Sequence, residues 1–248
     1  MTAHGLARPM ELTFLGTRGN TEKRSRRHWR HSALLVRHAG ASVMIDCGAD
    51  WLRSLPSLSP SGIVLSHAHP DHAQGLKQGA PCPVFATAET AASLRAYPIA
   101  DMRIIGLNKP FRIGALKIEA FPVAHSILAP TVGYRITGGR SAFFYVPDVV
   151  AIPQREQALK GVSLYVGDGA TISRPIIRRR RTAAIGHTPI RTQLQWCAAE
   201  GVDHAIFTHC GSKIVTGDAR RLDRLVESLG EDQGVNARIA YDGLRIVL

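Results

Sequence analysis

A histidine-rich stretch, HAHPDH at positions 67–72, contains the residues of this chain that are best suited to metal chemistry. Imidazole nitrogens and carboxylate oxygens are common protein ligands of zinc. Side chains two positions apart on an extended backbone face the same side, so His67 and His69 can bind one ion. Asp71 and His72 fall in the expected turn into a helix and can face a second ion. The stretch therefore predicts a pair of divalent metal ions.

Each of these histidines taken alone has a simpler interpretation. A single histidine beside a strand is more often a hydrogen-bonded residue than a metal ligand. The cluster reverses this balance, because four such groups packed together without a cation are costly if the loop is even partly buried. A metal site is the better interpretation of the group.

Further candidates stand directly after apolar stretches that we expect to be strands. Strand ends are where side chains become available to a shared site at one edge of a sheet. His125, shortly after 116–121, can complete the ligand set of the first ion. Asp148, shortly after 141–146, can either bridge two cations or end a turn. Asp46, after 42–45, either orients a ligand histidine or caps a turn. The remaining candidates are Asp168 and His209, which follow the stretches 162–166 and 204–208.

One more histidine, His187, stands just before an expected helix. Thr188 is suited to be its N-cap and Pro189 its first residue, and Gly201 ends it. A helix N-terminus attracts an anion but lowers the pKa of a nearby histidine. A carboxylate is therefore needed to keep His187 protonated as an acid, and Asp168 could supply it.

Two arginine-rich stretches accompany these candidates. Arg178, Arg179, Arg180 and Arg181 precede His187, and positions 23–31 include Arg27, Trp29 and Arg30. Each stretch is either a solvated surface or a phosphate-binding element, with Trp29 available for stacking on a base or sugar. The formal charge of +12 favours polyanionic partners.

The elements that must position these residues are strands and helices in alternation, with several strands paired as hairpins. This mixture predicts helices outside two stacked mixed sheets, in one domain spanning 1–248. We expect strands at 10–15, 33–36, 42–45, 63–65, 84–86, 103–105, 116–121, 131–136, 141–146, 162–166, 204–208, 238–240 and 244–248. We expect helices at 73–79, 88–97, 188–201 and 218–229.

The cysteines and the apolar runs bear on the compartment. Cys47, Cys82, Cys197 and Cys210 form no C-x-x-C pair, and the chain begins with no secretory signal. We therefore expect a reducing, cytoplasmic location and no separate cysteine-bound zinc. No apolar run approaches the roughly 20 residues of a membrane helix, so no membrane association is expected.

The order H-x-H-x-D-H, H, D, H over His67 to His209 resembles that of the metallo-β-lactamase superfamily. The second half is similar to the ribonuclease Z branch, through residues 164–171 and His187-Thr188, although Asp168 stands where that branch has glutamate. The resemblance implies an α/β (α+β) fold, a four-layer αββα sandwich with two zinc ions. The segment between His72 and His125 is too short for the protruding arm with which ribonuclease Z grips transfer RNA.

The resemblance also implies roles for the candidates. Asp148 would bridge two zinc ions, with manganese or iron as alternatives; Asp71 would orient a hydroxide held by the ions; His187, oriented by Asp168, would protonate the leaving group. The ligand sets would be His67, His69 and His125 for one ion and Asp71, His72 and His209 for the other.

The expected function is that of a ribonuclease Z-like, dinuclear zinc-dependent phosphodiesterase or nuclease that hydrolyses nucleic acid. A cyclic-phosphate phosphodiesterase acting on a small molecule is one alternative, and a lactone or thioester hydrolase is another. A nucleic-acid-binding protein without catalysis is a third. The partner is then nucleic acid or a small phosphodiester, and a homodimer is allowed.

Overall fold

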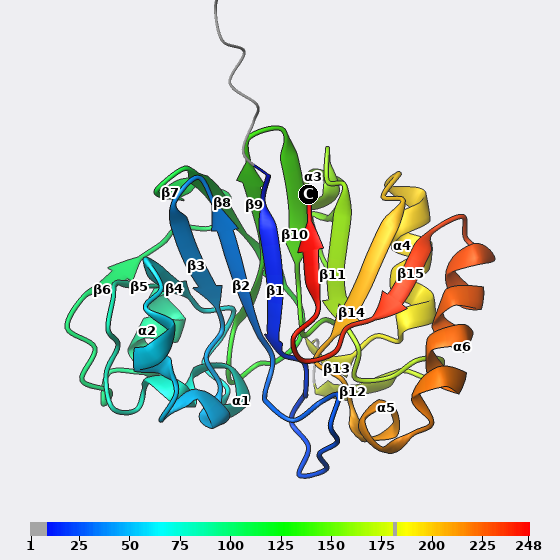
Figure 1. Ribbon diagram of the computed structural model, residues 1–248, viewed down its shortest axis with the longest axis horizontal. Helices are drawn as coiled ribbons and strands as arrows, with labels where there is room; N and C mark the ends of the chain where they lie inside the picture. Colours follow the sequence, from blue (N-terminus) through cyan, green and yellow to red (C-terminus); the bar gives the residue numbers. More distant parts are fainter. Residues whose placement is uncertain (1–8, 181–182) are drawn as a thin grey trace, which may run out of the picture.

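The computed structural model describes residues 9–180 and 183–248, in which two seven-stranded sheets face each other (Figure 1). The first sheet has the order β16-β1-β2-β3-β4-β5-β6. Its strands are β1 (Glu11–Gly16), β2 (Ala33–His38), β3 (Ala41–Ile45), β4 (Gly62–Val64), β5 (Val84–Ala86), β6 (Met102–Ile104) and β16 (Arg245–Val247).

The second sheet has the order β15-β14-β11-β10-β9-β8-β7. Neighbouring strands β10, β11 and β14 are parallel, and β8 runs in the same direction because it is antiparallel to β9, which is antiparallel to β10. The strands are β7 (Phe111–Ile113), β8 (Leu116–Val123), β9 (Thr131–Gly138), β10 (Ser141–Tyr145), β11 (Leu164–Asp168), β14 (His204–Thr208) and β15 (Asn236–Ile239).

Helices cover the outer face of each sheet, which gives four layers (Figure 1). The first sheet is covered by α1 (Pro70–Ala73), α2 (Ala88–Ser93) and the 3-10 turns η1 (Ala49–Trp51), η2 (Leu55–Leu58) and η3 (Gln74–Leu76). The second is covered by α3 (Arg155–Leu159), α4 (Ile190–Ala199), α5 (Ser212–Thr216) and α6 (Ala219–Glu231).

Strand β2 shows why both faces of a sheet are covered. Successive side chains of a strand point to opposite faces. Leu34 and Val36 belong to the core between the two sheets, whereas Leu35 belongs to the core between the first sheet and its helices. Because all three are buried, this part of the strand has no solvent face, and only Arg37 near its end is exposed. The predicted αββα sandwich is confirmed.

A small third sheet lies outside this sandwich. It is the hairpin of β12 (Ile176–Arg180) and β13 (Ala183–His187), whose strands pair only with each other among the described residues. The hairpin lies at the lower edge of the molecule in Figure 1. We refer to it below as the arginine hairpin.

The sequence predicted most strands of the two large sheets, but it missed β7, α3, α5 and the arginine hairpin. One correction concerns the start of α4. Its N-cap is Pro189, because the Thr188 hydroxyl donates to the Val150 carbonyl instead (2.6 Å). Within the described residues, no helix is both long and apolar enough to span a membrane.

Candidate metal centre

Three histidines meet where β4 and β8 end. His67, His69 and His125 offer ligand atoms that lie within 4.8 Å of one another. His67 is fully buried, and its Nε2 lies 2.9 Å from His69 Nδ1. The strand ends thus bring together residues from two different sheets, as the predicted first ligand set requires.

A second group forms beside the first. Asp71, His72 and His209 also offer atoms within 4.8 Å of one another. Asp71 Oδ2 lies 3.1 Å from His209 Nε2 and 3.3 Å from His72 Nε2. The start of α1 and the end of β14 supply these residues, which form the predicted second set.

Asp148 lies between the two groups. Its Oδ2 is 2.7 Å from Nε2 of His72 and 3.8 Å from Nε2 of His67. Its Oδ1 is 3.8 Å from His125 Nε2 and 3.3 Å from His209 Nδ1. A single carboxylate therefore faces members of both sets, which is the position required of a bridging ligand.

The ligand atoms of this cluster fit a divalent metal. Asp71 Oδ1, His72 Nε2, Asp148 Oδ2 and His209 Nδ1 are buried and have no hydrogen-bond partner within residues 9–180 and 183–248. The short contact between His72 and Asp148 lacks the alignment of a hydrogen bond. Buried polar atoms nearly always have a hydrogen-bond partner. These four atoms are therefore best explained as ligands of a metal ion.

The charges of the cluster also favour positive charge at its centre. Burial alone would lower the pKa of His209, but Asp148 and the neighbouring carboxylates raise it to about 10. His72 behaves alike: burial opposes protonation, yet Asp71 and Asp148 raise its pKa well above the ordinary value. Such a field attracts divalent cations, which would displace those protons.

Outer partners orient two of the histidines. Asp46 Oδ2 accepts from His72 Nδ1 (2.9 Å), and Asp46 Oδ1 accepts from the Ser66 backbone N–H (2.8 Å). Of the two roles expected for Asp46, the structure therefore supports the orientation of a ligand histidine. His125 Nδ1 lies 2.9 Å from the Gly186 carbonyl oxygen, which fixes its ring from the other side.

His187 and Asp168 form a pair at the rim of the cluster. His187 Nδ1 lies 2.8 Å from Asp168 Oδ2, and Asp148 Oδ1 is 3.4 Å from the same nitrogen. Asp168 is fully buried and accepts from the backbone N–H groups of Val149 (3.0 Å) and Ala170 (2.8 Å). Burial would lower the pKa of His187, but the Asp168 carboxylate raises it above its ordinary value.

Sequence reasoning missed two residues that support the cluster, Gln193 beside Asp168 and Gly186 beside His125. Gln193 Nε2 donates to the carbonyls of Asp168 (2.8 Å) and Thr188 (2.9 Å), and its Oε1 accepts from Asp168 N–H (2.9 Å). A polar residue on the apolar face of α4 was the available signal. Gly186 has φ of 124°, and an added Cβ would lie 1.9 Å from the Ile176 carbonyl oxygen. No sequence pattern indicated that position 186 requires a residue without a Cβ.

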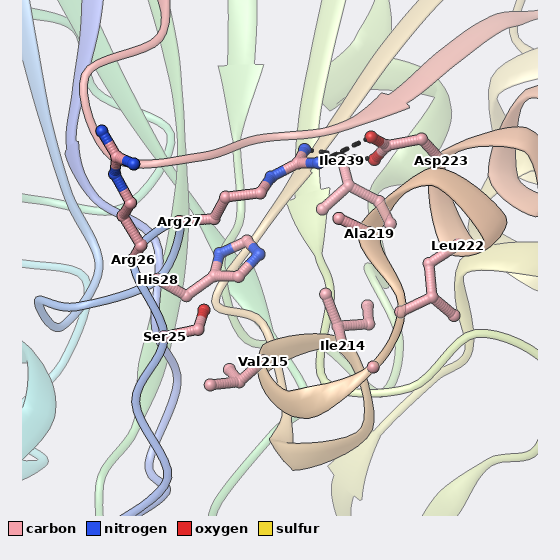
Figure 2. Close-up of a pocket in the computed structure, with 11 residues that line it drawn as sticks. Ser25, Arg26, Arg27, His28, Ile214, Val215, Ala219, Leu222, Asp223 and Ile239 are labelled. Atoms are coloured by element: carbon pink, nitrogen blue, oxygen red, sulfur yellow. Dashed lines mark hydrogen bonds and ion pairs between the residues drawn. The ribbon is translucent and has the colours of Figure 1, made fainter.

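The predicted phosphate-binding arginines have different surroundings. Arg27 forms two contacts with the Asp223 carboxylate, of 2.7 and 3.2 Å, as Figure 2 shows. Arg30 lies over the Trp51 ring, 4.4 Å from its centroid. Arg178, Arg179 and Arg180 are exposed on β12, while Arg181 lies outside the described residues. Phosphate binding by any of them stays a prediction.

The cavity in Figure 2 is separate from the cluster. It has a volume of about 180 Å³ and lies between the loop at Ser25–His28 and the helices α5 and α6. None of the seven candidate metal ligands lines it. The cavity therefore takes no part in the candidate centre.

Comparison with known protein families shows to which superfamily the chain belongs. Residues 41–210 match the model of the beta-lactamase superfamily domain, a span that holds all seven candidate ligands. The chain belongs to the beta-lactamase superfamily. Together with the ligand cluster, this membership makes the protein a metal-dependent hydrolase.

Relatives within the superfamily include ribonuclease Z. That of Methanopyrus kandleri is 25% identical over 258 residues, covering 84% of this chain and 89% of the relative. Three further curated relatives of the same name are 24–28% identical. This superfamily member is thus similar to the ribonuclease Z branch, as the motifs predicted.

Solved structures share the fold. The metallo-beta-lactamase fold protein YhfI from Bacillus subtilis has a TM-score of 0.75 at 17% identity, covering 97% of this chain and 100% of that one. Zn(2+)-bound PqqB from Methylobacterium extorquens has a TM-score of 0.74 at 18% identity, covering 96% and 100%. These likenesses concern the fold alone.

Proposed function

We propose that this hydrolase is a dinuclear zinc phosphodiesterase of the ribonuclease Z type that cleaves nucleic acid. The observation that supports it most is the position of Asp148, which faces members of both ligand sets. The similarity to proteins named ribonuclease Z and the charge of +12 favour a polyanionic phosphodiester over a neutral ester.

In this proposal three residues would hold each ion, and Asp148 would contribute to both sites. His67, His69 and His125 would hold the first, and imidazole-rich sets of this kind suit zinc. When bound, two such ions supply a nucleophile at neutral pH, because coordination lowers the pKa of water from about 15.7 towards 7. The second ion would be held by Asp71, His72 and His209.

The chain's own residues position the reactants. Asp71 Oδ1 has no hydrogen-bond partner among the described residues and can accept a hydrogen from the attacking water. Asp168 holds His187 through Nδ1, so His187 Nε2 is the atom free to give a proton to the departing oxygen. Gln193 and two backbone N–H groups keep Asp168 in place.

Metal analysis followed by hydrolysis of bis-p-nitrophenyl phosphate tests the chemistry. Wild type should contain zinc and turn over this substrate. His187→Ala should be much slower on an oligonucleotide, because a departing sugar oxygen, unlike p-nitrophenolate, needs a proton. His204→Ala is a matched control, because His204 is exposed at the far end of β14 from His209. Equal rates for His187→Ala and wild type would remove His187 from the reaction.

A panel of substrates separates the alternatives. Structured RNA, single-stranded DNA, a cyclic nucleotide, a lactone and a thioester are compared across salt concentrations. Cleavage of polynucleotide that weakens steeply as salt rises supports the proposal. Hydrolysis of the cyclic nucleotide alone would replace it with a small-molecule phosphodiesterase, and hydrolysis of only the lactone or thioester would exclude phosphodiester chemistry.

A further inference from the structure

The arginine hairpin begins at the candidate centre and leads away from it. Its register pairs Ile176 with His187 at one end and Arg180 with Ala183 at the other. At about 3.3 Å per residue, Arg178 and Arg180 lie about 7 and about 13 Å along the ladder from His187. The hairpin therefore extends from the proton donor of the proposed reaction to a group of cations.

The charge of the hairpin is unpaired. Arg178, Arg179 and Arg180 are exposed, and none has an acidic partner in the part of the chain that the structure describes. A two-stranded sheet is marginally stable on its own, and the like charges of Arg178 and Arg180, two positions apart on one face of β12, repel each other. These arginines therefore do not serve the stability of the hairpin, and a polyanion would relieve their repulsion.

Exposed apolar side chains gather at the base of the hairpin. Ile176 is 51% exposed, Ile177 is partly exposed, and Leu128 is 84% exposed in the loop after His125. The two segments meet, because the Gly186 N–H donates to the His125 carbonyl (3.0 Å) and Gly186 pairs with Ile177. Apolar surface beside a row of cations suits a ligand that has both bases and phosphates.

We propose that the arginine hairpin is the polynucleotide-binding arm of this active site and that it takes a single-stranded segment. The proposal rests on the phosphodiesterase function proposed above. Phosphates next to the scissile bond bind Arg178 and Arg180, which share a face of β12 with Ile176, and Arg179 reaches them around the edge of β12 that does not pair with β13. Unstacked bases lie on Ile176 and Leu128. A duplex fits less well because its bases are stacked and cannot reach the apolar side chains.

The length of the arm limits how much of the strand it can contact. Because the bases of this segment are unstacked, its phosphates lie farther apart than the 3.4 Å per strand of a duplex, so about 13 Å of arm reaches fewer than four phosphates beyond the scissile bond. The catalytic efficiency should rise as a substrate is lengthened on that side and then level off. This dependence distinguishes a local arm from a general attraction by net charge.

The test removes the three arginines together. In Arg178→Gln/Arg179→Gln/Arg180→Gln, kcat/KM for a single-stranded oligonucleotide should fall roughly tenfold or more at low salt, and the salt slope should drop by about 2, at about 0.7 per phosphate contact. Turnover of bis-p-nitrophenyl phosphate should not change, because the centre is intact.

A matched control removes the same charge elsewhere. Arg112, Lys117 and Arg140 are exposed cations at the ends of β7, β8 and β9–β10 that lie opposite His125 and Asp148. The triple glutamine variant at these positions should behave as wild type on both substrates. If it loses oligonucleotide cleavage as much as the hairpin variant does, net charge explains the effect and the arm is refuted.

Binding separates this proposal from the catalytic one. A labelled phosphorothioate oligonucleotide, which is cleaved slowly, is titrated into the zinc-loaded proteins, with inorganic polyphosphate as competitor. Weaker binding by the hairpin variant supports the arm; equal binding overturns it. If polyphosphate displaces the labelled oligonucleotide as well, per phosphate, as unlabelled oligonucleotide does, the bases contribute nothing to binding and that part of the proposal is overturned. A wild type that binds the oligonucleotide but hydrolyses no phosphodiester refutes the catalytic proposal alone.

Discussion

The metal centre and the arginine hairpin meet at the end of β13, at Gly186 and His187, but they are built in opposite ways. In the centre the ligand residues are buried, with the exception of the half-buried His69, and carboxylates offset the imidazoles. On the hairpin the arginines are exposed and have no counter-charge among the described residues. The two regions therefore meet different demands, since a reaction needs fixed geometry, whereas the binding of a polymer needs a surface that water and salt can reach.

Salt separates the two regions further. Interactions of exposed charges weaken once they are more than about 8 Å apart at physiological ionic strength, whereas buried pairs are screened much less. Binding of a polymer by the hairpin should therefore vary with salt, and turnover of a small substrate by the centre should vary little. A change confined to one region should therefore leave the other unaffected.

Removal of the metal should have the largest effect. Chelation should abolish turnover of every substrate, because in the proposed reaction the bound metal is what lowers the pKa of the attacking water. Oligonucleotide binding by the hairpin should persist, as measured by fluorescence anisotropy before and after chelation. As a control, activity should return when zinc is added back but not when buffer alone is added. If oligonucleotide binding is lost when the metal is removed, the two regions are not separate.

Loss of the proton donor should come next. His187→Ala should lower kcat for the oligonucleotide by roughly 10²–10⁴-fold, the usual contribution of a general acid. KM should change little, since the hairpin arginines remain. Steady-state kinetics over a range of oligonucleotide concentrations separate the two constants, and a rise in KM with unchanged kcat would move His187 from the reaction to binding.

Substitution of Gly186, where the two regions meet, should have a smaller effect. Gly186→Ala should lower turnover of bis-p-nitrophenyl phosphate by roughly 10–100-fold, as for other residues that orient a metal ligand. Its Cβ would meet the Ile176 carbonyl at 1.9 Å, so the Gly186 carbonyl must move away from His125. Gly201→Ala, at a positive-φ glycine with open space around it, controls for backbone strain. Equal activity of the two variants would contradict this role.

A histidine outside both regions should affect stability alone. Burial, with help from Arg27, lowers the pKa of His28 to about 4. The unfolded chain therefore binds the proton first, so stability should fall as pH drops from about 6.5 to about 4, by at most a few kcal/mol at about 1.4 kcal/mol per pKa unit. His28→Asn, which can still donate to Thr17, should show a flatter pH dependence in urea unfolding. A parallel fall in both proteins would exclude His28.

The sequence predicted the strand-end positions well and the hairpin poorly. A short apolar run such as 63–65 or 204–208 is enough to predict a strand. The residues that follow such runs were therefore recognisable as candidates. On β12, by contrast, three consecutive arginines conceal any alternation, because both faces of this strand are exposed. The periodicity that reveals a strand requires one buried face.

The sequence by itself determined which side chains are available for metal chemistry, because ligand type and spacing are written locally at 67–72 and at each strand end. Only the tertiary structure decided how they meet, since the contacts join residues far apart in the chain: 138 positions separate His209 from Asp71, and 61 separate His125 from Gly186. Such contacts depend on how two sheets pack and on one left-handed backbone position. Neither is encoded by a local pattern.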